Sequence, residues 1–268
     1  MNHLVVPAAT RIDLNLSMPP TTKDGYGLVL AWLRSHTPKF APVQSFVFSE
    51  RWPDGVEIVA RDTCDLSLEA PHWNDFDEDE GPMLRIILRS LYRPRDFLDQ
   101  MRRICEALHL EDVRRIDVFI NLYWTQQDWL AFFGRYRRVE YALVGSKCAH
   151  SFFDALTANC DPDNASNLPS TNVEPLFPSL AYLELRAMDF YGDAGEDKCM
   201  WEVIHDALWL RSNIAPLDTL KIQGCRMRAE EADRFRDVVS HVSWDEEGAG
   251  YATSDDFISQ SDDDDDDL

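Results

Sequence analysis

An acidic run is the first group of residues in this chain whose types could do chemistry, because carboxylate oxygens are the ligands that calcium prefers. The run reads DFDEDEG, from Asp75 to Gly81. A helix-flanked calcium loop needs glycine at its sixth position and a bidentate glutamate at its twelfth. Counted from Asp75, those positions hold Glu80 and Ile86. The spacing does not fit, and we interpret the run as a surface loop.

Cysteine and histidine occur close together at two places, where they could begin a zinc site. Cys148 lies two residues before His150, and Cys105 lies four residues before His109. A zinc finger needs a second pair of ligands at a defined spacing, and neither place has one. We therefore predict no metal site and no cofactor. His109 follows an apolar run that reads as helical, so we expect it to cap that helix or to lie at the surface.

Nucleophilic catalysis has no recognisable motif here. Gly145-Ser146-Lys147-Cys148 lacks the second glycine of a G-x-S-x-G elbow, and the glycine-rich phosphate-binding loops are absent from the sequence. A cysteine–histidine pair could assemble in space, but no pattern selects one of the six cysteines. No catalytic residue is predicted, and an uncharacterised hydrolase stays as an alternative.

The elements that would position these residues follow one short phrase, repeated eight times: an apolar residue, two others, an apolar residue, one other, and an apolar residue. The copies are Ala9, Ile12, Leu14; Val43, Phe46, Phe48; Met83, Ile86, Leu88; Val113, Ile116, Val118; Tyr136, Val139, Tyr141; Leu180, Leu183, Leu185; Leu217, Leu220, Ile222; and Val239, Val242, Trp244. This is the strand phrase of a leucine-rich repeat, in which alternate residues point into a stacked core. Several spacings between copies are longer than the roughly 20–29 residues of standard repeats.

Helical patterns fill the segments between these phrases. Apolar residues recur at helical spacing over 95–105, 125–133, 146–158, 197–210 and 228–239. Alternating strands and helices predict right-handed crossovers and a mainly parallel sheet. We therefore predict an α/β fold, an irregular leucine-rich-repeat solenoid of about eight repeats from Ile12 to Trp244, with helices on the convex side. An ordinary doubly wound α/β domain is the alternative.

Charge is distributed unevenly along the chain, whose formal net charge is −22. The range 54–81 holds ten acidic residues against one basic, and 244–268 holds eleven acidic and no basic residues. We predict a repeat domain over 1–246 and an acidic disordered tail over 247–268, with loops at 65–81 and 159–175. This acidity argues against nucleic acid as a partner.

Arginines are concentrated between Met83 and Glu140, which gives this range a net charge of +3. Asp99 and Arg103 lie four residues apart in the helical run 95–105, so we expect an ion pair between them. The arginines are most simply a solvated face. The alternative is a docking patch for an acidic segment, including the tail of this chain.

Features of targeting are missing from the sequence. No run of about 18 apolar residues occurs, so we expect no membrane span. The first residues, MNHLVVPAATRID, have neither the basic start nor the apolar stretch of a secretory signal. We therefore expect a cytoplasmic or nuclear protein with reduced cysteines.

Four stretches, which cover most of residues 28–247, resemble one large family. They are SHTPKFAPVQSFVFSERWPDGVEIVARDTC, YRPRDFLDQMRRICEALHLEDVRRIDVFINLYWTQQDWLAFFGR, LFPSLAYLELRAMDF and APLDTLKIQGCRMRAEEADRFRDVVSHVSWDEE. They are similar to the F-box/leucine-rich-repeat-like proteins that are expanded in mushroom-forming fungi. The resemblance implies repeats that hold a substrate, while an F-box bundle docks on the adaptor of a cullin–RING ubiquitin ligase. No F-box sequence precedes the first phrase at Ala9.

These observations together predict a non-enzymatic protein-interaction scaffold, a substrate-recognition module related to F-box ubiquitin-ligase receptors. Its partner is a protein of unknown identity, with an indirect connection to cullin–RING ligase components. We expect shape and charge complementarity at outward strand residues: Arg115, Asp117, Glu140, Glu184, Arg186 and Lys221. Tyr123 and Trp124 follow a strand and are expected to be exposed for the same partner. A truncated gene product without binding activity is the other alternative.

Overall fold

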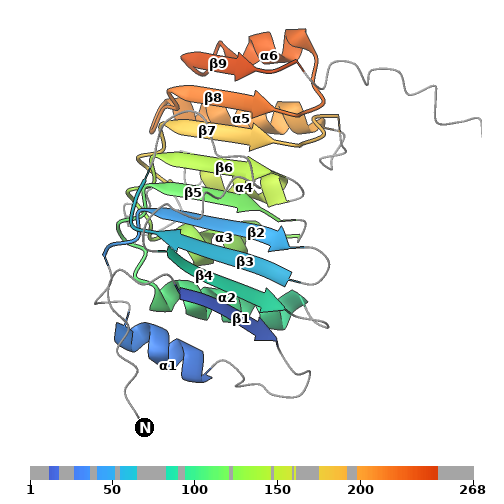
Figure 1. Cartoon of the computed structure of the whole chain (residues 1–268). Helices are drawn as coiled ribbons and strands as arrows, with labels where there is room; N and C mark the ends of the chain where they lie inside the picture. Colours follow the sequence, from blue (N-terminus) through green and yellow to red (C-terminus); the bar gives the residue numbers. More distant parts are fainter. Residues whose placement is uncertain are drawn as a thin grey trace, which may run out of the picture.

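The computed structural model describes residues 12–17, 27–36, 41–51, 55–64, 83–89, 94–120, 123–145, 148–158, 160, 175–191 and 198–246. The acidic loop predicted at 65–81, nearly all of the loop at 159–175 and the tail at 247–268 lie outside these residues. Within them, the chain forms nine strands and six helices in an α/β arrangement (Figure 1).

All nine strands belong to one sheet. They are β1 (Ile12–Ser17), β2 (Ser45–Arg51), β3 (Gly55–Arg61), β4 (Met83–Arg89), β5 (Arg115–Phe119), β6 (Tyr141–Gly145), β7 (Tyr182–Arg186), β8 (Thr219–Gln223) and β9 (His241–Trp244). Their order is β1-β4-β3-β2-β5-β6-β7-β8-β9, so from β5 onward each strand lies beside the next one in the chain. Every pair that excludes β3 is parallel, which confirms the mainly parallel sheet.

β3 was not predicted, and it runs antiparallel to both of its neighbours, β2 and β4. Its sequence, GVEIVAR, does not contain the repeated phrase. The phrase describes a strand with one apolar face, whereas β3 has apolar residues on both faces. Val56 and Ile58 join the main core, whereas Val59 contacts Val47 on the opposite face. A strand buried on both faces reads as a continuous apolar run rather than as an alternation.

Helices α2 to α6 lie behind the sheet in Figure 1 and cover one of its faces. Each contacts the next in chain order, and α1 packs against α2 at the end of this row. The six helices are α1 (Gly27–His36), α2 (Pro94–Ala107), α3 (Gln126–Phe133), α4 (Ala149–Thr157), α5 (Met200–Ser212) and α6 (Ala229–Phe235). Helices were predicted in all of these segments except that of α1.

Helix α3 begins where the sequence indicated, because its first turn is capped. The Asp128 amide donates to the Thr125 hydroxyl at 3.2 Å, and the Thr125 amide donates to the Asp128 carboxylate at 2.8 Å. This reciprocal capping box satisfies two main-chain donors that the first turn would otherwise leave without a helical partner.

The core lies between the helices and the strand residues that face them. The register pairs Phe46 with Ile116 and Leu183 with Leu220, and all four side chains are completely buried. Across from the strands, α3 contributes Trp129, which is also completely buried. Burial of each large apolar side chain stabilises the fold by about 1.5–3 kcal/mol, so this continuous layer holds the sheet and the helices together.

The fifth phrase was placed three residues too early. β6 starts only at Tyr141, and the residues that it turns toward the helices are Ala142 and Val144. Val139, Ala142 and Val144 have the same spacing as the phrase, but alanine is a weaker apolar signal than tyrosine. As a result Tyr141, which was assigned to the core, lies on the other face of the sheet.

The apolar stripe of α2 is confirmed, with Met101, Ile104 and Cys105 buried against the sheet. The expected partner of Asp99 is wrong. Its carboxylate pairs with Arg102 at 3.0 Å, one residue earlier than the predicted Arg103. Both spacings bring side chains to the same side of a helix.

His109 follows the end of α2 and is exposed, with a φ of 51°. A left-handed conformation brings Cβ close to the following carbonyl oxygen and costs a residue other than glycine about 1–2 kcal/mol. We therefore expect His109→Gly to raise the free energy of unfolding by about 0.5–1 kcal/mol, after the larger entropy of glycine in the unfolded chain is subtracted. Urea denaturation measures this change. His109→Ala keeps the strain and serves as the control, so an equal gain in both variants would contradict the explanation.

Candidate interaction surface on the polar face

The face of the sheet opposite α2–α6 carries most of the predicted partner-binding residues. We call the side chains of β5–β8 that point to this side the polar face; they are Arg115, Asp117, Phe119, Tyr141, Leu143, Tyr182, Glu184, Arg186, Thr219, Lys221 and Gln223. The parallel register places Tyr141 between Arg115 and Tyr182. It likewise pairs Glu184 with Lys221. Side chains from strands far apart in sequence are thereby brought into two rows across the sheet.

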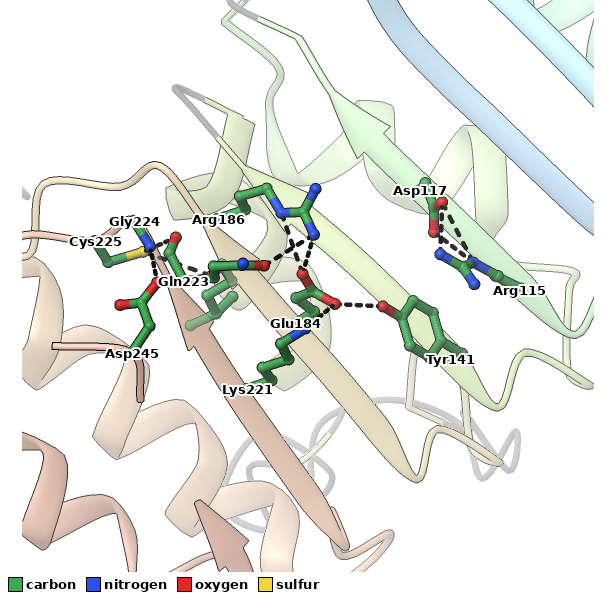
Figure 2. A network of polar contacts seen from close by, with 11 residues as sticks. Arg115, Asp117, Tyr141, Glu184, Arg186, Lys221, Gln223, Gly224, Cys225 and Asp245 are labelled. Carbon is green, nitrogen blue, oxygen red and sulfur yellow. Dashed lines mark hydrogen bonds and ion pairs between the residues drawn. The ribbon is translucent and has the colours of Figure 1, made fainter. Parts of the chain in front are cut away.

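Glu184 lies at the centre of a hydrogen-bonded network on the polar face (Figure 2). Its completely buried carboxylate accepts from the Tyr141 hydroxyl at 2.5 Å and from Arg186 Nη2 at 2.5 Å. Lys221 Nζ lies 3.7 Å away. Arg186 Nη2 also donates to the side-chain oxygen of Gln223 at 3.0 Å. A buried carboxylate needs such partners, because burial without them costs several kcal/mol.

A second group adjoins this network on β5 and β6. Arg115 Nε donates to Asp117 at 3.1 Å, and the Arg115 guanidinium lies 4.3 Å from the centre of the Tyr141 ring. The Tyr141 ring stacks in turn on Tyr182, with centres 4.6 Å apart and planes at 11°. Cation–π and stacking contacts each stabilise such a row by about 0.5–2 kcal/mol. These contacts fix the side chains relative to one another.

Burial decides the electrostatics of the polar face. It raises the pKa of the Asp117 carboxyl, against the opposing effect of Arg115. Burial lowers the pKa of Arg115, but the charge and hydrogen bond of Asp117 outweigh it, so the net shift is upward. Burial, followed by the charge of Glu184, raises the pKa of Tyr182 to about 12, and the same two causes raise the pKa of Tyr141. Both tyrosines therefore stay protonated at neutral pH.

Gly145 allows the strands around this network to approach closely. A Cβ at this position would lie 2.5 Å from the Phe119 ring and 2.6 Å from the carbonyl oxygen of Arg186. Real Cβ atoms essentially never approach other heavy atoms so closely. The glycine of the sequence GSKC thus has a packing role beside the polar network.

Five of the predicted site residues come together: Arg115, Asp117, Glu184, Arg186 and Lys221. Arg115, Asp117 and Glu184 are buried, while Arg186 and Lys221 keep partial exposure. Glu140 is not part of this network. It precedes β6 and pairs with Arg114, whose Nη2 lies 2.5 Å from its carboxylate.

The predicted exposure of the aromatic pair after β5 is confirmed for Tyr123 and wrong for Trp124. Tyr123 is 79% exposed, whereas Trp124 is only 5% exposed. The Trp124 ring stacks on Phe132 with centres 5.0 Å apart and meets Trp129 edge-on at 4.8 Å. Its large apolar ring gains more from this aromatic cluster than from solvent.

Tyr141, Tyr182 and Gln223 belong to the site but were not singled out from the sequence. Tyr182 and Gln223 have the correct alternation, since each lies two residues from a predicted site residue on its strand. Tyr141 was missed because the fifth phrase placed it in the core. If Ala142 and Val144 had been assigned to the core, the alternation of side chains along β6 would have placed Tyr141 on the polar face.

Metal and thiol chemistry receive little support. Across the described ranges, no group of three or more histidine, cysteine, aspartate or glutamate residues could hold a metal ion. The six cysteines are all unbridged. Burial raises the pKa of both Cys105 and Cys148 to about 12, and the thiolate is the form that acts as nucleophile and metal ligand. These two thiols therefore stay protonated and poorly reactive at neutral pH.

No helix in the described residues combines the length and the apolar content needed to cross a membrane. In comparisons with known proteins, no family model, no curated protein and no solved structure matches the chain. The geometry of the polar face is therefore the main observation on which its function can be argued.

Proposed function

We propose that this chain is a non-enzymatic protein-interaction scaffold that binds a partner protein on its polar face. The observation that carries the proposal is the network around Glu184, which holds Arg186 and Lys221 in fixed positions across neighbouring strands. Charged groups that are already ordered lose little conformational entropy when a partner binds, and this improves affinity. Their partial exposure lets them contact a carboxylate of the partner.

The same network supports binding rather than catalysis. A general base has to reach the proton that it removes. Glu184 is completely buried, and its oxygens already accept from Tyr141 and Arg186. For the hydrolase alternative, the nucleophile would have to come from elsewhere, and the protonated thiols of Cys105 and Cys148 are poor candidates.

The mostly parallel sheet with helices on one face supports an irregular leucine-rich-repeat solenoid, in which each unit stacks on its neighbours. Kinship with F-box ubiquitin-ligase receptors rests on the four resembling stretches of sequence. On this proposal the repeats recognise a substrate protein in the cytoplasm or nucleus, and another chain supplies the connection to cullin–RING components.

Neutralising one lysine on the polar face tests the proposal. The tagged chain, its Lys221→Gln variant and its Lys198→Gln variant are each purified from native cells, and the recovered proteins are quantified by mass spectrometry. Lys198 is the matched control, since it pairs with Asp206 beside α5, away from the polar face. We expect at least one partner to fall threefold or more with Lys221→Gln and to stay unchanged with Lys198→Gln, because a lost interfacial charge contact weakens binding.

Thermal melting of both variants shows whether the fold is kept. Equal recovery of every partner by all three chains would contradict binding at the polar face. Recovery of the cullin adaptor would support attachment to a ligase. If no partner protein is recovered, the alternative of a truncated gene product without binding activity would be favoured.

A further inference from the structure

β9 is the last strand of the sheet, and within the described part of the chain only β8 pairs with it. The amide of His241 donates to Asp218 at 2.9 Å, and that of Asp245 donates to Ile222 at 3.3 Å. Main-chain groups alternate in direction along a strand, so those of Val242 and Trp244 point away from β8. An edge of this kind is a template for pairing with another extended chain.

The side chains of β9 define what an added strand would look like. His241 and Ser243 are exposed, whereas Val242 and Trp244 are half-buried and pack against the main core. Residues of a neighbouring strand would follow the same alternation. A partner would therefore place apolar side chains beside Val242 and Trp244, and polar ones beside His241 and Ser243.

The acidic residues that follow β9 determine which charge a partner peptide should carry. From Trp244 to Leu268 the chain has eleven acidic and no basic residues. A strand rich in lysine or arginine is attracted to this region, whereas an acidic strand is repelled. Pairing of two copies at β9 would join two strongly acidic chains at this edge, and like charges on the two sides of an interface disfavour self-pairing.

We propose that the outer edge of β9 binds an extended peptide from a partner protein, in which apolar residues alternate with lysine or arginine. The peptide adds a strand that runs antiparallel to β9, so that its valines pair with Val242 and Trp244, and the main-chain bonds of these pairs provide affinity. The acidic residues after β9 provide selectivity for basic sequences. This site is separate from the polar face, so either proposal can fail without the other.

Binding of a defined peptide to the full chain tests the proposal. The probe is a fluorescent seven-residue peptide in which lysine and valine alternate, and its fluorescence anisotropy is measured against protein concentration. In one matched peptide glutamate replaces lysine, and in a second proline replaces valine. Proline keeps the charge but removes the donors needed for a strand. We expect both matched peptides to bind at least tenfold more weakly than the probe.

A backbone variant separates strand addition from charge attraction. Val242→Pro removes an amide that points outward, and proline is tolerated at such edge positions. We expect the variant to bind the probe at least fivefold more weakly, whereas Val242→Thr, which keeps the amide, stays within twofold of the original chain. Hydrogen exchange in the unmodified chain gives an independent measure, since the amides of Val242 and Trp244 become protected when the probe binds.

Four outcomes would overturn the proposal. Equal binding of the proline peptide would show attraction to the acidic tail alone. Absence of binding at about 1 mM probe, or unchanged exchange at Val242 and Trp244 in the bound chain, would exclude strand addition. Sedimentation as a dimer through this edge would identify a second copy as the occupant. If Val242→Pro fails to fold, the exchange measurement decides.

Discussion

Replacement of Glu184 by alanine is expected to lower the free energy of unfolding by about 3–5 kcal/mol, as for other buried ion pairs that lose one partner. The carboxylate is completely buried, and its loss leaves the Tyr141 hydroxyl without its acceptor and the Arg186 guanidinium without its charged partner, with Gln223 as its remaining acceptor in this network. For a chain of this size, the melting temperature is expected to fall by about 2–4 °C for each kcal/mol. Urea denaturation followed by tryptophan fluorescence measures the loss.

A double-mutant cycle with Tyr141→Phe assigns part of this loss to one hydrogen bond. Tyr141→Phe alone is expected to cost about 1–2 kcal/mol, because the hydroxyl donates to a charged acceptor. In the Glu184→Ala background the same change is expected to cost almost nothing. Additive losses, or a loss below about 0.5 kcal/mol for Glu184→Ala, would show that the network does not hold the polar face together.

The second large effect is expected at Arg211, a buried arginine in the last turn of α5. Its two terminal nitrogens donate to the carbonyl oxygens of Leu176 and Phe177, at 2.9 Å and 2.5 Å. Burial lowers the pKa of Arg211 to about 10, so the guanidinium is still charged at neutral pH. Arg211→Met leaves the Leu176 carbonyl buried without this donor, at a cost of about 1–3 kcal/mol. It also removes a hydrogen bond from a charged donor, which contributes about 1.5–3 kcal/mol, to the Phe177 carbonyl, although that oxygen still accepts from the Leu180 amide at 3.0 Å. We expect a net loss of about 3 kcal/mol, since removal of the buried charge offsets part of this cost.

Two further variants make the Arg211 prediction specific. Arg211→Lys keeps the charge but cannot donate from two planar nitrogens, so it is expected to recover less than half of the loss. Arg236→Met is the control, because Arg236 pairs with Asp233 on the exposed surface of α6 and should change stability by less than about 0.5 kcal/mol. Equal losses for Arg211→Met and Arg236→Met would contradict the assigned role.

Much of the fold follows from local patterns in the sequence. Seven of the eight apolar phrases mark strands, because alternate residues such as Ile116 and Leu183 face one continuous core. Segments that depart from the repeated pattern could not be predicted in this way. β3 is buried on both faces, and α1 packs against α2 at the end of the helix row.

The candidate site was predictable in its position but not in its contacts. Alternation along β5, β7 and β8 places Arg115, Glu184 and Lys221 on one face, and the structure confirms that placement. Which of them would be buried depends on partners from other strands, such as Tyr141. Sequence patterns describe neighbours three or four residues apart, whereas the bond between Tyr141 and Glu184 joins positions about forty residues apart.

The antiparallel strand β3 also has a consequence for the order in which the sheet folds. Arg51 and Gly55 are register partners only four positions apart, whereas Tyr141 pairs with Tyr182 across a crossover of about forty residues. Closing a short loop costs less entropy than closing a long one, and hairpins form within about 1–10 μs. The β2–β3 hairpin can therefore form early, before the parallel strands, and offer β5 an edge on which the slower part of the sheet assembles.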